Sequence, residues 1–187
     1  MRHWKGALIS IIAVLVVVVA ASSAMVASPQ ETTMIQAYQI ALKTAHEWDP
    51  NARLYHMISV DIEGKTDSLQ GALGTRAKWN VEFVDPDTGR QLGVYVTNGV
   101  AGQPREAKNP TVWPGTTQFP TIDLKRAIQV ATDSGVTPSQ SMFFGYHYRL
   151  VYNEESKQLE LWLYGRNGEG TPKTLRFQPE STVLINA

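Results

Sequence analysis

The apolar positions after residue 30 first recur at helical spacing and then alternate as they do in strands. A helix is predicted to begin at a capping box formed by Thr33 and Gln36 and to end at Asp49-Pro50. Its apolar face comprises Met34, Tyr38, Ala41, Leu42 and Ala45. Strands are predicted over 54–63, 76–84 and 91–97, with a turn at 85–90 between the last two.

Alternation within these strands predicts which side chains face the helix. In the first strand the even positions share one face, which places His56 on the inward side as a hydrogen-bonded core histidine. The residues predicted inward are Leu54, Ile58, Val60 and Ile62, then Trp79, Val81 and Phe83, then Leu92, Val94 and Val96.

The same order of elements then repeats. A second helix is predicted to open with Pro120-Thr121-Ile122-Asp123, with Leu124, Ala127, Ile128 and Ala131 on one face and an end at Ser134-Gly135. Strands are predicted over 142–152, 159–164 and 174–178. Because Ala37 and Ala41 fall on Ala127 and Ala131 about 90 residues later, we predict an internal duplication.

The predicted fold class is therefore α+β, with two tandem helix-plus-antiparallel-sheet units at 31–99 and 121–187. Residues 100–120 are rich in proline and glycine and are expected to form a connector without regular structure. Trp113 within it either plugs an apolar gap between the units or stands half exposed.

A hydrophobic segment precedes the first unit. Residues 7–21 are apolar apart from Ser10, with Arg2 and Lys5 before them and small residues after, the layout of an export signal. Cleavage near Ala24 would release the rest of the chain. If the segment is retained, the 22 residues at 6–27 reach about 33 Å as a helix and can anchor the chain in a membrane. Both readings of residues 1–27 place the remainder outside the cytoplasm.

Composition limits the possible functions. Without residues 1–24, which hold two of the 17 Lys and Arg and none of the 17 Asp and Glu, the net charge is about −2. This balance gives no electrostatic reason to bind nucleic acid. The absence of cysteine excludes disulfides, thiol catalysis and a lipid-modified N-terminal cysteine. The apolar core must then hold an exported domain together.

Several short motifs resemble the PepSY family, whose modules have a helix followed by an antiparallel meander and whose fold is cystatin-like. They are the alanine-rich helix, the strand Trp79-Asn80-Val81-Glu82-Phe83, and Asp87-Thr88-Gly89-Arg90 followed by Val94-Tyr95-Val96. Thr97-Asn98-Gly99 stands where the family's closing Asp-containing turn would be. The resemblance implies a non-catalytic extracytoplasmic module, of a kind associated with the restraint of peptidases.

No local catalytic, cofactor or metal signature is present. His46-Glu47 lacks the second histidine of a zinc-protease helix. Asp85, Asp87 and Gly89 fit a hairpin turn better than a calcium loop, because the bidentate glutamate is missing. No nucleophile elbow occurs. A catalytic set assembled from distant residues stays possible on the sequence alone.

One predicted hairpin carries a candidate binding surface. A turn at 154–157 pairs Tyr152 with Leu159, Leu150 with Leu161, and Tyr148 with Leu163 on the inward face. The outward face then pairs Arg149 with Trp162 and His147 with Tyr164, so that these four residues form a candidate partner-binding strip.

The sequence thus favours an exported, non-catalytic binding or regulatory module of the cell envelope, with a protein or peptide partner and no cofactor. A structural spacer of an envelope complex and an extracytoplasmic hydrolase are the alternatives.

Overall fold

A computed structural model describes residues 30–63, 70–108, 113–140 and 144–186. The predicted signal or anchor at residues 1–27 lies outside these ranges. Within them, no helix has the length and apolar character needed to cross a membrane.

The first half forms the expected helix and meander. Its elements are β1 (Thr32–Thr33), α1 (Met34–Trp48), β2 (Arg53–Ser59), β3 (Thr75–Arg76), β4 (Lys78–Val84) and β5 (Arg90–Thr97). The capping box is confirmed, since Thr33 Oγ1 accepts from the Gln36 amide and the Gln36 side chain accepts from the Thr33 amide. Asp85 closes the β4–β5 turn by accepting from the Asp87 and Thr88 amides, which confirms the turn interpretation.

The second half repeats the order of a helix followed by strands. Its elements are α2 (Leu124–Asp133), β8 (His147–Asn153), β9 (Gln158–Arg166), β10 (Pro172–Phe177) and β11 (Leu184–Asn186). Asp123 begins α2 by accepting from the Arg126 amide. The register of the β8–β9 hairpin is the predicted one, including Arg149 opposite Trp162 and His147 opposite Tyr164.

The region predicted to be an unstructured connector contains two further strands. Chain 100–120 includes β6 (Val100–Ala101) and β7 (Arg105–Lys108), both antiparallel to β5. The expectation was wrong here because the free edge of β5 offers unpaired backbone groups that a neighbouring segment satisfies. Trp113 is half buried and stacks on Tyr152, with ring centroids 4.7 Å apart and planes 4° apart.

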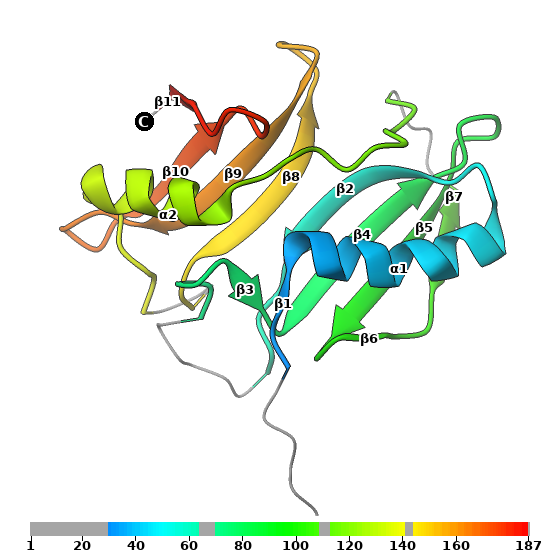
Figure 1. Ribbon diagram of the computed structural model, residues 1–187, viewed down its shortest axis with the longest axis horizontal. Helices are drawn as coiled ribbons and strands as arrows, with labels where there is room; N and C mark the ends of the chain where they lie inside the picture. Colours follow the sequence, from blue (N-terminus) through cyan, green and yellow to red (C-terminus); the bar gives the residue numbers. More distant parts are fainter. Residues whose placement is uncertain (1–29, 64–69, 109–112, 141–143, 187) are drawn as a thin grey trace, which may run out of the picture.

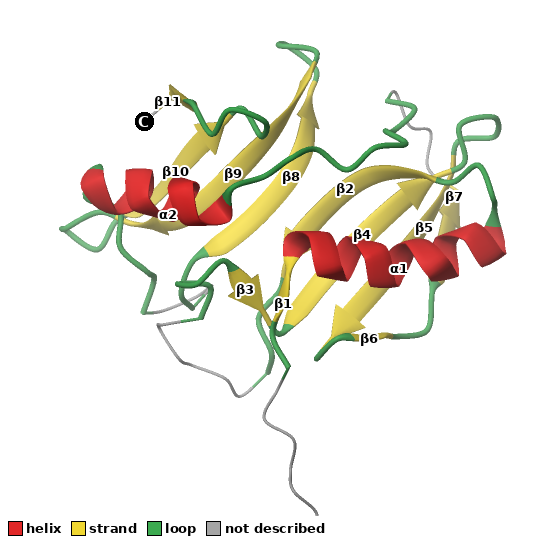
Figure 2. Ribbon diagram, viewed as in Figure 1, coloured by secondary structure: helices red, strands yellow, loops and turns green. Residues whose placement is uncertain are grey.

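The two halves share one sheet. Nine strands are described in it, in the order β11-β10-β9-β8-β2-β4-β5-β6, with β7 also against β5. The halves join where β2 and β8, the first strands after α1 and α2, pair antiparallel through Met57–Leu150 and Ile58–Arg149. Both helices lie on the same face of this sheet (Figures 1 and 2). The fold is α+β; the boundaries of the two units, 31–99 and 121–187, stay a prediction.

The core lies between the two helices and the face of the sheet that they cover. Strand residues predicted inward are buried on both halves, among them Trp79, Val81, Phe83, Val94, Leu150, Leu161 and Leu163. Leu42 and Ile128, predicted as buried helix residues, are partly buried at the edge of this core. Ala37 and Ala41 of α1, like Ala127 and Ala131 of α2, are fully buried, because alanine lets each helix approach the sheet closely.

The prediction of which β2 side chains face the helices is correct at Leu54 and wrong from His56 onward. The β2–β4 register shifts between Leu54 and His56, so the alternation changes side at that point. Leu54 and Met57 are therefore buried against the helices, while His56 and Ile58 belong to the opposite face. A one-residue irregularity of this kind reverses every side chain that follows it.

We expect Leu161→Ala to lower the free energy of unfolding by about 2–5 kcal/mol, because it leaves a cavity in the closed core. Urea denaturation measures this change. Leu73→Ala is the matched control, since Leu73 is 78% exposed and its truncation should cost less than about 0.5 kcal/mol. Equal effects of the two substitutions would contradict the assignment of the covered face.

Candidate functional site

The sheet face opposite the helices, which we call the open face, carries a row of side chains across five strands. Register pairs place Asn80, Ile58, Arg149, Trp162 and Arg176 side by side on β4, β2, β8, β9 and β10. These residues alternate with buried core positions, so they project away from α1 and α2. The row crosses the β2–β8 junction and therefore depends on both halves.

Trp162 lies between two guanidinium groups. Arg149 stands 5.4 Å and Arg176 5.5 Å from the centroid of the Trp162 ring, which confirms the predicted Arg149–Trp162 contact and adds a second cation. Arg176 also donates two hydrogen bonds to the Glu160 carboxylate, at 2.9 and 2.8 Å. These contacts fix the planes of all three side chains.

Glu160 is the buried anchor of this arrangement. Its carboxylate is fully buried and accepts from Arg176, from Trp162 Nε1 at 2.8 Å and from Asn153 Nδ2 at 2.8 Å. Burial by itself raises the pKa of Glu160, but these hydrogen bonds outweigh it and lower the pKa below the usual range. Only one signal of this role is visible in the sequence: a charged residue between the apolar positions Leu159 and Leu161.

His56 extends the network toward the first half of the chain. Arg149 Nε donates to His56 Nε2 at 2.7 Å, so His56 Nδ1 carries the proton toward Glu82 Oε2, 3.3 Å away. The hydrogen bond with His56 is the main cause of a lowered pKa for Glu82. His56 is thus hydrogen-bonded as predicted, but on the open face rather than in the core.

His147 was predicted to be part of an exposed strip, and this was wrong. It is 3% exposed, and its ring lies among Ser59, Asp61 and Arg76. Nε2 is 2.8 Å from Asp61 Oδ1, while Nδ1 is 3.1 Å from Ser59 Oγ. These residues come from segments far apart in the sequence, which pattern analysis of one strand could not bring together.

Arg76 completes this buried cluster. Its fully buried guanidinium donates to Asp61 at 2.8 Å and to the carbonyl groups of Phe144 and Tyr146 at 2.8 and 3.3 Å. Burial and the positive charge of Arg76 lower the pKa of His147, although Asp61 acts in the opposite direction. In the neutral ring, Nε2 lies 2.8 Å from the Asp61 carboxylate and 3.1 Å from the Arg76 guanidinium, while Nδ1 lies 3.1 Å from both the hydroxyl and the carbonyl oxygen of Ser59.

Ser59, His147 and Asp61 have the composition of a hydrolytic triad, but the serine lacks the accessibility of a nucleophile. Ser59 is 2% exposed, and its Oγ accepts from the Tyr148 amide at 3.0 Å. A nucleophilic serine must reach a substrate carbonyl, which this hydroxyl could do only if β2 and β8 separated. The described residues also contain no group of three His, Asp or Glu side chains placed to hold a metal.

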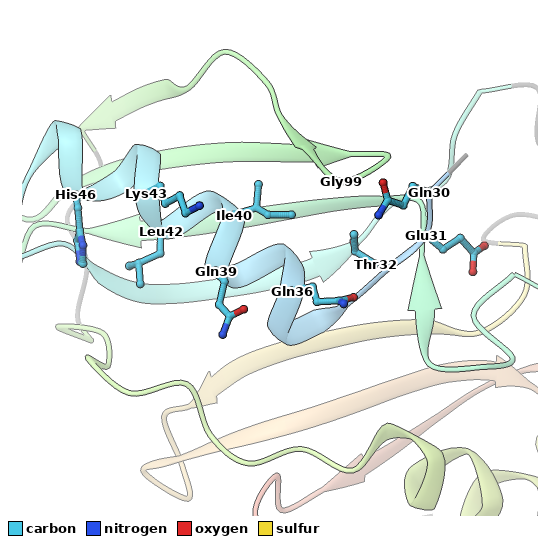
Figure 3. Close-up of a pocket in the computed structure, with 10 residues that line it drawn as sticks. All are labelled: Gln30, Glu31, Thr32, Gln36, Gln39, Ile40, Leu42, Lys43, His46 and Gly99. Atoms are coloured by element: carbon cyan, nitrogen blue, oxygen red, sulfur yellow. The ribbon is translucent and has the colours of Figure 1, made fainter. Parts of the chain in front are cut away.

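Two hollows differ in character. One has a volume of about 410 Å³, lies on the open face beside Tyr164, and is lined mainly by apolar surface. The other, about 580 Å³, is a groove along α1 that includes Gln39, Lys43 and His46. Figure 3 shows that its side chains leave the helix in different directions and do not converge on one point. The hollow on the open face is the one of these two whose lining is mainly apolar, as is typical of small-molecule sites.

Comparison with known proteins gives a fold likeness only. The chain matches no protein-family profile and no curated protein. It resembles the crystal structure of a "putative lipoprotein" from Clostridium difficile 630, with a TM-score of 0.55 and 8% sequence identity, over 80% of this chain and 90% of that one. At this identity the likeness shows a shared fold.

We expect the free energy of unfolding to decrease as the pH falls below about 6.5, because of His147. Its folded-state pKa lies below 6.5, so the unfolded chain binds this proton first and stability is complete only above that pH. The loss develops as the pH falls from 6.5 toward the folded-state pKa.

Urea denaturation between about pH 8 and about pH 5 tests this, a range in which most carboxylates stay ionised. His147→Gln is the matched variant: it should be less stable at neutral pH but should lack this component of the slope. Identical slopes in the two proteins would contradict the assigned state of His147.

Proposed function

We propose that this protein is an exported, non-catalytic binding module of the cell envelope that holds a protein or peptide partner on its open face. The N-terminal export pattern and the resemblance of short motifs to the PepSY family support the location and the regulatory class. The fold likeness to a protein described as a putative lipoprotein is in keeping with an envelope role.

The observation that carries the proposal is the contact of Trp162 with Arg149 and Arg176 within the row on the open face. Tryptophan and arginine are the residue types most enriched in binding hot spots, and here their conformations are fixed before any partner arrives. Preorganised side chains lose little conformational entropy on binding, which favours affinity. The helices lie on the other face of the sheet (Figure 2), which leaves the open face available to a partner.

Peptidase restraint is the regulatory role that the PepSY resemblance suggests. In that case the partner is an envelope peptidase whose activity falls when this protein is added. A structural spacer would bind its partner and leave its activity unchanged. The separation of these two roles therefore requires an activity assay on the captured partner as well as the capture itself.

We expect the double variant Arg149→Ala/Trp162→Ala to lose capture of its partner from an envelope fraction. The midpoint of thermal unfolding should stay within about 4 °C of the original protein, because both side chains are only partly buried. The control is Gln39→Ala/Lys43→Ala, which removes two exposed side chains of the α1 groove and should capture normally.

Capture that survives in the Arg149/Trp162 variant would contradict the proposal and would move the contact elsewhere, for example to the connector around Trp113. A collapse of thermal stability would show that the row serves the fold instead. Activity of the purified protein on peptide, ester or glycan substrates, abolished by Ser59→Ala without loss of folding, would favour the hydrolase alternative.

A further inference from the structure

The apolar hollow on the open face is built from strands of both halves. Tyr164 and Thr174 are cross-strand neighbours on β9 and β10, and His147 lies opposite Tyr164 on β8. Ile58 of β2 contributes the wall from the first half. The volume of about 410 Å³ falls within the range of roughly 300–1,000 Å³ that is typical of small-molecule sites.

The charged side chains that line this hollow are both positive. They are Arg166 and Lys173, while His147 and Tyr164 line it in their neutral forms, and none of the described lining residues is acidic. Arg166 is held in the wall, since its Nε donates to Ser139 Oγ at 3.0 Å and its Nη1 to the Gly170 carbonyl. Ser139 lines the same hollow, so the guanidinium and its partner are fixed together.

Tyr164 adds a neutral donor. Burial raises the pKa of its phenol, although Arg149 acts in the opposite direction, so the hydroxyl keeps its proton at neutral pH. A ligand that fits this hollow has two parts. Its apolar part lies among Ile58, Tyr164 and Pro172, and its one anionic group lies beside Arg166.

We propose that this hollow is a binding site for a small carboxylate with an apolar tail. This goes beyond the proposed protein-binding function and does not depend on it. The same chemistry is offered by a medium-chain fatty acid and by the free C-terminus of a peptide with an apolar last residue, so the test includes both.

Isothermal titration of the full chain, with amide chemical shifts as the second readout, tests the site. Octanoate represents the fatty acid, and Ala-Ala-Leu with a free C-terminus represents the peptide. Octan-1-ol, acetate and the amidated peptide each lack one part of the proposed ligand. We expect saturable binding of octanoate or of the free peptide, at least about tenfold tighter than that of its matched control. The amide shifts should centre on Gly165 and Thr174.

A pair of substitutions at Thr174 localises the site. Thr174 is exposed at the rim, so Thr174→Trp should fill the space without disturbing the core and should weaken binding by at least about tenfold. Thr174→Val keeps the volume and should bind normally. Thr117→Trp, at an exposed position outside the lining, controls for an added tryptophan.

Three outcomes would overturn the proposal. The first is that neither octanoate nor the free peptide binds saturably. The second is that octanol binds as tightly as octanoate, or the amidated peptide as tightly as the free one. The third is that Thr174→Trp leaves the affinity unchanged. The Arg149→Ala/Trp162→Ala variant separates this site from the proposed partner surface. Both residues lie outside the lining, so the variant should still bind the small carboxylate even where partner capture is lost.

Discussion

The buried guanidinium of Arg76 is the constraint on which the rest of the structure depends. It follows the first half's long β2–β3 connection, yet it donates to the carbonyl groups of Phe144 and Tyr146 immediately before β8. Buried ion pairs add little net stability, whereas the removal of one partner typically costs about 3–5 kcal/mol. The contribution of Arg76 is therefore mainly positional: only an arrangement that brings 144–147 to it gives its Nη1 group these two carbonyl partners.

Close backbone packing reinforces this constraint. Gly145 has a positive φ of 79°, and a Cβ placed there would lie 1.9 Å from the carbonyl oxygen of Gln70. The Tyr146 amide donates to that same oxygen at 2.9 Å. With 70–76 and 144–147 in contact, β2 and β8 pair in a defined register, and the row on the open face follows. The apolar hollow depends on the same register, since Ile58 and Tyr164 come from different halves.

The elements that local periodicity determines could be predicted from the sequence. Both helices, the capping box of α1 and the β8–β9 register were found because each rests on neighbours in the chain. Alternation also found Arg149 and Trp162, but it could not show that His147 is covered by Asp61 and Arg76, since that contact joins distant segments. The β2 bulge and the pairing of β2 with β8 have no local signal either. The roles of Glu160 and Arg176 became visible only when the order of the strands was known.

Native-state hydrogen exchange tests most directly whether the two halves form one cooperative unit through this junction. If they do, the slowest amides of β4, β2, β8 and β9 will report the same free energy of opening, equal to that of global unfolding. If the amides of β8 and β9 opened at a free energy lower by more than about 2 kcal/mol than those of β4, the halves would unfold separately. The central role of the Arg76 junction would then be contradicted.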